Sequence, residues 1–236
     1  MITQFKLELD KTSGLTIPAY EAEEMYLWLN SGAMKFVKTR YSGLNSKKQG
    51  FEQTQKRTDD LRTLVREKSI TGANLIASTA KPNAYVADLT SLTATLADIY
   101  LFALEEEVTI TYTTTSADDI LATSAGSRQG VTEVTANDYR AHIDDPYSEH
   151  ILHYEKAKPL RLFLGDTVEL ITDGNYVISE YHIRYIAHPQ IISSIISCDL
   201  PEHTHEEIVK IAANMALENI EQPRYQSHAN EVNTME

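Results

Sequence analysis

Apolar side chains recur at helical spacing near the front of the chain. Between residues 18 and 40 they fall on one face of a helix, and the set is Ala22, Met25, Tyr26, Leu29, Ala33, Phe36 and Val37. Pro18 and a group of glutamates stand where this helix would begin, and basic residues stand at its other end, as the helix dipole prefers. We therefore predict a helix over 18–40. A second helical repeat over 51–68, after a connection containing Gly and Asn, predicts an N-terminal helical hairpin.

From residue 70 onward the pattern changes to that of β-strands, with β-branched and aromatic residues separated by turn-forming residues. We predict extended segments over 75–79, 85–89, 97–114, 160–163, 168–172, 176–186 and 191–197. The last four form a predicted meander, with hairpin turns at Gly165-Asp166 and Asp173-Gly174-Asn175. Residues 116–130 are polar and predict a surface loop, and residues 137–153 predict a short helix interrupted before Pro146.

A further amphipathic helix is predicted towards the end of the sequence. Thr204 and Glu207 have the Thr-x-x-Glu spacing of a capping box, in which hydroxyl and carboxylate each satisfy an amide of the first turn. An apolar stripe then runs to about Ile220, and Pro223 prevents much continuation. Residues 222–236 have almost no apolar stripe, so we expect this arm to stay mobile or to fold on a neighbour.

These elements predict an α+β protein with an N-terminal helical hairpin, a central mostly antiparallel β region, and a C-terminal helix with an extended arm. The predicted boundaries are 1–69 for the helical hairpin segment, 70–198 for the β region, 199–221 for the C-terminal helix that packs on the core, and 222–236 for the arm. With 236 residues, 42% of them hydrophobic, the chain can form one sizeable core or two small ones.

Charge is distributed unevenly along the chain. The formal net charge is -13, yet residues 35–68 hold ten basic and four acidic side chains, so this segment is +6 and the remainder is -19. Nucleic-acid affinity depends on Lys and Arg that neutralise phosphates, so the total argues against a surface that wraps nucleic acid. The asymmetry indicates a basic helical face that meets an acidic partner or DNA, or, in the alternative, two ordinary solvated helix faces.

The single cysteine and the lack of long apolar runs indicate which cellular compartment to expect. Cys198 alone excludes an internal disulfide framework and argues against a cysteine-based zinc site. The neighbouring Asp199 would raise the pKa of its thiol and oppose thiolate formation. No window approaches the roughly 20 apolar residues that span a bilayer, and the N-terminus has no signal-peptide pattern. We expect a soluble protein without a membrane partner.

No residue pattern indicates catalysis. The pairs His203 with His205 and His150 with His153 resemble metal-ligand pairs, but residues two apart on a helix point in different directions and no third ligand is defined. The sequence has no nucleophile elbow, phosphate loop or dinucleotide fingerprint. We therefore expect no enzyme, and no catalytic, cofactor-binding or metal-binding residues. A His-dependent metalloenzyme stays open as a third hypothesis.

Four blocks of sequence carry a resemblance to a known family. They are Leu29–Tyr41, Lys56–Arg62, Asp199–Val209 and Ala216–Gln226. These blocks resemble the ring or adaptor proteins of the portal vertex in crAss-like and other short-tailed bacteriophages, and they cover about a third of the chain. None of them is a catalytic signature, so the resemblance concerns architecture and assembly.

The resemblance implies a structural virion protein that forms a homo-oligomeric ring of the head-to-tail connector. Such rings stack beneath the portal, join it to the tail and line the DNA conduit used in ejection. The implied partners are copies of this chain in a closed ring, the portal protein and neighbouring tail ring proteins. DNA would pass through the lumen without specific binding, and an acidic lumen would limit sticking. The implied location is the portal vertex or tail of the virion, with the host cytoplasm during assembly.

We expect the hairpin and the arm to form the subunit or portal contacts, because the hairpin is basic and the arm has no core of its own. The candidate interface residues are Lys47, Lys48, Lys56, Arg57, Arg62, Pro223, Arg224 and Tyr225. Tyrosine joins apolar area to a polar tip and is enriched in interfaces, which favours Tyr225. The alternative function is a small regulator that binds nucleic acid through residues 35–68.

Overall fold

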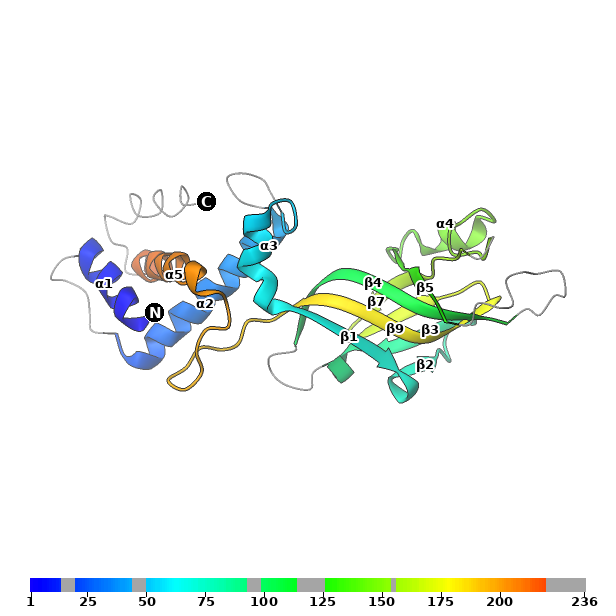
Figure 1. The fold of residues 1–236 in the computed structure, drawn as a ribbon, viewed down its shortest axis with the longest axis horizontal. Coiled ribbons are helices and arrows are strands. Elements are labelled where there is room, and N and C mark those ends of the chain that lie inside the picture. The colour runs from blue at the N-terminus through cyan, green and yellow to red at the C-terminus, as the bar shows by residue number, and fades with distance from the viewer. Residues whose placement is uncertain (14–19, 44–49, 93–98, 114–125, 154–155, 220–236) are drawn as a thin grey trace. The chain divides into compact units, whose positions relative to one another are not determined.

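The computed structural model describes residues 1–13, 20–43, 50–92, 99–113, 126–153 and 156–219. Its elements are helices and mainly antiparallel sheets, which confirms the predicted α+β class (Figure 1). The chain divides into two compact units, a helical unit formed by Met1–Val65 with His188–Glu236 and a β unit formed by Arg66–Ala187. The β unit is thus inserted between the two stretches that build the helical unit.

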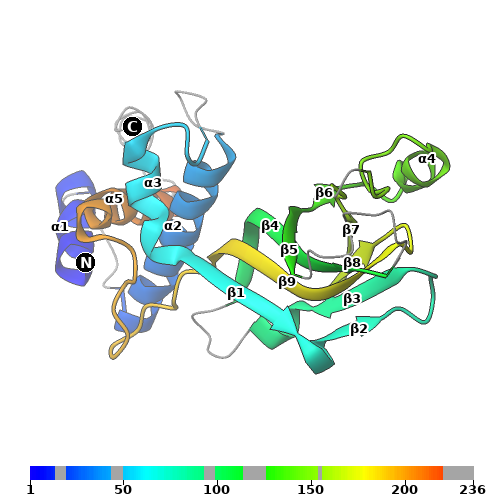
Figure 2. The same ribbon diagram turned by 45° about the vertical axis from the view of Figure 1, so that its right-hand side comes forward.

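Helices packed around an apolar core form the helical unit. Its described elements are α1 (Ile2–Ser13), α2 (Ala22–Ser42), α3 (Gln55–Leu61), α5 (His205–Asn219) and the 3-10 turns η2 (Arg62–Leu64) and η7 (Glu202–Thr204). Helix α5 packs against both α1 and α2 (Figures 1 and 2). The buried core consists of Phe5, Leu9, Met25, Leu29, Ile192, Val209, Ala212, Ala213, Ala216 and Leu217.

Helix α2 confirms the first predicted helix, and its two ends have local causes. The Glu24 carboxylate accepts a hydrogen bond from the amide of Glu21, as part of a capping box between these two glutamates. Gly43 ends the helix with a φ of 66°, a left-handed conformation that favours glycine. The apolar face is buried from Met25 to Val37, as its periodicity predicts.

Helices α2 and α5 cross closely at a glycine. A Cβ atom added to Gly32 would lie 3.0 Å from the Cβ of Ala212 and 3.1 Å from the carbonyl oxygen of Ile208. These separations are shorter than ordinary van der Waals contact, and one of the two atoms belongs to backbone, which cannot rotate away. A glycine is therefore required at this crossing.

Two predicted elements of this part of the chain are wrong in extent. The helix predicted over 51–68 ends at Leu61, and Val65 begins a strand that joins a sheet of the β unit. The segment 191–197 is not a strand. The side-chain amide of Asn30 accepts a hydrogen bond from the backbone N–H of Ile192 at 2.7 Å and donates one to the backbone carbonyl of Ile192 at 3.1 Å. These two backbone groups are therefore bonded to a side chain and not to a neighbouring strand.

The predicted capping box of α5 is replaced by other contacts. The hydroxyl and amide of Thr204 both donate to the carbonyl of Pro201, at 2.7 and 3.0 Å. The Glu207 carboxylate binds Arg40 of α2 instead of the helix end. The carboxylate that the capping box would use is therefore engaged in an ion pair with a distant residue.

Helix α1 is not predicted by the sequence pattern, because its described side chains bury only Phe5 and Leu9.

Two sheets and a short helix, α4 (Tyr139–Asp144), form the described part of the β unit. The strands are β1 (Val65–Thr71), β2 (Leu75–Ala77), β3 (Ala84–Asp88), β4 (Tyr100–Tyr112), β5 (Ser127–Gly130), β6 (Thr132–Glu133), β7 (Leu160–Leu164), β8 (Thr167–Ile171) and β9 (Tyr176–Ala187), with 3-10 turns η3 (Gly72–Asn74) and η4 (Leu89–Leu92). The strand orders are β1-β9-β4-β5 and β2-β3-β8-β7-β6. Strand β6 pairs with β7 in parallel, and the long strands β4 and β9 pair antiparallel, side by side in Figure 2.

The core of the β unit lies between the two sheets. Val108 of β4 and Ile183 of β9 share one buried cluster with Val168 of β8, which belongs to the other sheet. Side chains alternate along a strand, so the residues directly before and after each of these positions point to the opposite face of their sheet. Glu107 and Arg184 therefore lie on the outer face of the first sheet.

The structure also corrects two connections in the β unit. Ser127–Gly130 is a strand paired with β4, where a loop is predicted over 116–130, and the first part of that loop lies outside the described residues. The turn at Gly165-Asp166 joins β7 to β8 as predicted. Asp173-Gly174-Asn175, in contrast, carries the chain from β8 to β9 in the other sheet, so the predicted meander is wrong. Helix α4 ends just before Asp145, as predicted.

Replacing Gly32 by alanine should destabilise the protein, although alanine has a helix propensity about 1 kcal/mol better than that of glycine. We expect a net loss of about 1–3 kcal/mol in the free energy of unfolding, because the new methyl group forces α2 and α5 apart. Equilibrium urea unfolding followed by circular dichroism measures this loss. The control is Gly130→Ala, whose Cβ meets nothing within 4 Å. A Gly32→Ala protein as stable as the wild type would contradict the close crossing.

Candidate functional site

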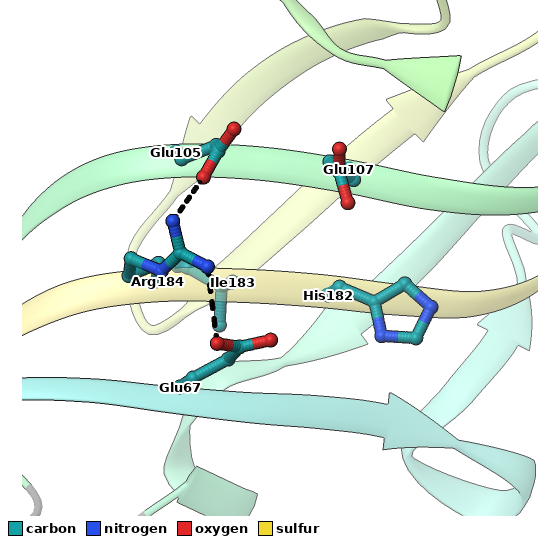
Figure 3. Close-up of a pocket in the computed structure, with 6 residues that line it drawn as sticks. All are labelled: Glu67, Glu105, Glu107, His182, Ile183 and Arg184. Carbon is teal, nitrogen blue, oxygen red and sulfur yellow. Dashed lines mark hydrogen bonds and ion pairs between the residues drawn. The ribbon is translucent and has the colours of Figure 1, made fainter. Parts of the chain in front are cut away.

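Charged side chains gather on the outer face of the sheet β1-β9-β4. Arg184 of β9 donates to Glu105 of β4 at 2.5 Å and to Glu67 of β1 at 3.1 Å, so its guanidinium bridges both neighbouring strands (Figure 3). Glu107 lies on the same face, two residues beyond Glu105. We call these four residues, with His182, the charged sheet face. Arg128 of β5 approaches Glu107 at 3.4 Å, and Glu180 lies beside His182. With these neighbours, four carboxylates stand against two guanidinium groups, which leaves the face acidic.

His182 ties the three strands together at the other end of this face. Its Nδ1 lies 2.7 Å from the hydroxyl of Ser69 on β1, and its Nε2 lies 2.8 Å from the hydroxyl of Thr109 on β4. Glu180 approaches the same Nε2 at 3.3 Å. Both ring nitrogens are thus engaged by groups of the sheet. The face holds its charges in fixed positions, which suits contact with, or repulsion of, another charged surface.

A second charged cluster centres on the buried side chains of Arg161 and Glu106, which lie between the two sheets. Arg161 of β7 forms ion pairs with Glu106 of β4 at 2.8 Å and with Glu133 of β6 at 2.7 Å. Burial raises the pKa of Glu106 from 4.5 to about 7, although the guanidinium of Arg161 opposes that rise. Burial likewise raises the pKa of Tyr181, with the charge of Glu106 adding to the effect. The ion pair of Arg161 with Glu106 connects the two sheets.

The helical unit contains a comparable buried cluster around Arg40. This side chain is 2% exposed, and it contacts both oxygens of Glu207 at 2.6 and 2.7 Å and Asp60 at 3.1 Å. Asp60 in turn lies 2.9 Å from Nε2 of His203. The cluster joins α2, α3, η7 and α5. Burial raises the pKa of Glu207, and Arg40 opposes that rise.

The candidate interface residues that the structure describes lie on α3 and at its end. Lys56 and Arg62 are exposed, and Arg62 approaches Asp59 at 3.7 Å. Arg57, by contrast, is buried at 3% exposure. The remaining candidates, Lys47, Lys48, Pro223, Arg224 and Tyr225, lie outside the described residues. The basic segment 35–68 is divided among α2, α3 and β1, so it does not form one helical face.

His203 and His205, one of the two pairs that resemble metal-ligand pairs, face different partners. His203 binds Asp60, whereas Nε2 of His205 lies 3.0 Å from the carbonyl of Leu200. Across the described ranges, no group of three or more His, Cys, Asp or Glu side chains is arranged to hold a metal ion. Burial raises the pKa of the Cys198 thiol, and Asp199 adds to the rise, in the predicted direction.

In the part of the chain that the structure describes, no helix is long and apolar enough to cross a membrane.

The charged sheet face was not predicted from the sequence. The alternation of Glu105 with Glu107 and of His182 with Arg184 shows which residues share a face, but the pairing of β4 with β9 is needed to bring the two sets together.

The charged sheet face of the β unit suits a protein that acts through contacts with other surfaces. The model of the family described as phage tail ring protein 3/4 matches residues 3–228, and the chain belongs to that family. The predicted resemblance to ring proteins of crAss-like phages is confirmed. No curated protein matches the chain. The protein is therefore a structural component of a phage tail, and hence of the virion, that assembles with other tail proteins.

Replacing Arg40 by methionine should strongly destabilise the helical unit. The substitution leaves the Asp60 carboxylate buried without its guanidinium, and breaking a buried pair in this way costs about 3–5 kcal/mol. Urea unfolding of the variant measures the cost. Arg140→Met is the matched control, because the ion pair of Arg140 with Asp144 is on the surface and is worth about 1 kcal/mol or less. Equal losses in both variants would contradict a special role for the buried charge.

Glu106 should make the β unit less stable as the pH rises. A carboxyl group with a raised folded-state pKa contributes stability that is complete below its unfolded pKa of 4.5 and is lost as the pH passes about 7. Wild type should therefore lose up to about 3 kcal/mol relative to Glu106→Gln between roughly pH 5 and pH 8. Urea unfolding at several pH values measures the difference. Glu107→Gln, on the outer face, is the control, and parallel pH profiles for wild type and Glu106→Gln would refute the effect.

Proposed function

We propose that copies of this chain form a closed ring in the head-to-tail connector of a phage, where the ring joins the portal to the tail. The observation that carries this proposal is the family match over residues 3–228. The ring works by contact alone and performs no reaction. Assembly takes place in the host cytoplasm, before or as the tail is attached. The finished ring serves as part of the path for DNA ejection.

The acidic character of the chain fits a ring that lines a DNA conduit. Its formal net charge of -13 repels phosphates, and the charged sheet face supplies carboxylates that are fixed in position. DNA passes such a wall without specific binding. The repulsion keeps the nucleic acid from adhering to the lumen during ejection.

Subunit contacts in a closed ring are heterologous, so each copy needs two unlike surfaces. We assign these contacts to the region of α2 and α3 and to the arm 222–236. The exposed residues Lys56 and Arg62 supply positive charge that can meet an acidic neighbour. The neighbours are further copies of this chain, the portal protein and other tail ring proteins.

The alternative, a nucleic-acid-binding regulator, needs the basic side chains of residues 35–68 on one accessible surface. Arg40 and Arg57 are buried, which removes two of them from such a surface. Filter binding of the purified protein to duplex DNA at several salt concentrations separates the two functions. A regulator would bind with an affinity that falls steeply with salt, whereas the ring subunit should show no such binding.

Removing residues 222–236 should impair incorporation of the protein into virions while the rest of the chain stays folded. The reason is that residues 222–236 have almost no apolar stripe with which to form part of a folded core. Complementation of a phage that lacks the gene, followed by protein analysis of purified particles, measures incorporation. Circular dichroism of the truncated protein is the control for folding. Normal incorporation of the truncated chain would rule out the arm as an assembly element.

A further inference from the structure

Helix α2 carries an open groove of about 510 Å³ on its outer side. Leu27 and Met34 contribute its apolar part, and Lys35 and Lys38 stand towards the C-terminal end of the helix. Leu27 is 63% exposed. Together these residues offer an apolar strip next to positive charge, which is the chemistry that an acidic, partly apolar segment would match.

The neutral polar groups of this groove already have hydrogen-bond partners. The hydroxyls of Ser31 and Thr39 donate to carbonyls one turn earlier on α2, at 2.9 and 2.8 Å, and the Asn30 amide binds the backbone of the 188–199 connection. Among the residues that the structure describes, Lys35 and Lys38 have no carboxylate within ion-pair distance. The two ammonium groups and the apolar strip are therefore the features left for a partner.

We propose that this groove binds the end of the C-terminal arm, residues 231–236, of a neighbouring copy of the chain. This segment reads Glu-Val-Asn-Thr-Met-Glu, so carboxylates at both ends enclose two apolar side chains, Val232 and Met235. Its charge of -2 balances the +2 of the two lysines. The inference rests on the proposed ring, in which copies of the chain lie next to one another.

The position of the groove favours the arm of a neighbour over the arm of the same copy. Met25 and Leu29 of α2 pack into the core that contains α5, and Gly32 touches α5 directly, whereas Leu27 lies on an exposed side. Helix α5 packs against the buried face of α2, whereas the groove lies on the exposed side of the same helix. A segment that follows α5 would have to pass around α2 to enter the groove of its own copy. A groove on the next copy gives the heterologous contact that closes a ring.

A disulfide test in the full-length protein can locate the arm. Two versions of the chain, both with Cys198→Ser, are co-expressed: one carries Leu27→Cys, and the other carries Met235→Cys and a mass tag. After mild oxidation, mass spectrometry should find a covalent species with one copy of each. The matched control replaces Leu27→Cys by Leu7→Cys, since Leu7 is equally exposed, at 62%, but lies on α1. We expect roughly tenfold more product from the groove cysteine, because docking raises its effective concentration.

Charge reversal tests the recognition itself. Lys35→Glu with Lys38→Glu should reduce the yield of the Leu27–Met235 product to the level of the Leu7 control, because four carboxylates then face one another. Adding Glu231→Lys with Glu236→Lys to the partner copy should restore it. If the yield of the disulfide product stays the same after both charge reversals, recognition at the groove does not depend on charge.

Native mass measurement of the same samples separates the possible failures. A ring without groove product above the Leu7 control would overturn this inference and leave the proposed function intact. A protein that stays monomeric at every concentration would overturn the proposed ring. A third version of the chain carries both Leu27→Cys and Met235→Cys. A disulfide that forms within this version but not between the first two would assign the groove to the arm of the same copy, which contradicts the inference.

Discussion

The helical unit depends on the buried positive charge of Arg40. A guanidinium is tolerated away from water only where carboxylates and hydrogen bonds replace its hydration, and Arg40 obtains both from α3 and α5. Glu207 lies 167 residues further along the sequence than Arg40. The requirement to satisfy this charge therefore brings the first 65 residues together with the chain after residue 188. The β unit is an insertion between these two stretches, and the ion pairs join the same two helices, α2 and α5, that cross closely at Gly32.

The β unit satisfies a buried arginine in a similar way. Arg161 lies between the sheets and is held by Glu106 and Glu133, with its guanidinium over the ring of Phe163 at 4.2 Å. In both units the carboxylate beside the arginine bears the cost of burial, since burial disfavours its charged form. This explains why burial raises the pKa of Glu106 and of Glu207 in spite of an arginine in contact with each. In each unit, a buried ion pair thus holds together elements that are distant in the sequence.

Hydrophobic periodicity correctly predicts those elements whose buried face can be read from their own stretch of sequence. Helix α2 and strand β4 bury one regular face, and a sequence window of ten to twenty residues contains that information. Strand β1 and the turn after Asp173 depend on partners that are distant in the sequence, so local pattern assigns them to a helix and to a hairpin. The candidate site shows the same limit. Arg57 has the sequence features of an exposed basic residue and is buried, while the charged sheet face needs the register of β4 with β9 before its members become neighbours.

Uneven charge also determines which contacts between copies are favourable. A ring needs two unlike surfaces on each subunit, because a patch that binds itself closes a dimer and leaves nothing for a third copy. A basic groove cannot pair with a second basic groove, since the ammonium groups repel. The rest of the chain carries -19 outside the +6 segment, so most other contacts between copies bring like charges together. In the proposed ring, charge complementarity joins the basic segment of one copy to an acidic segment of the next, and it favours the head-to-tail orientation before the apolar surfaces meet.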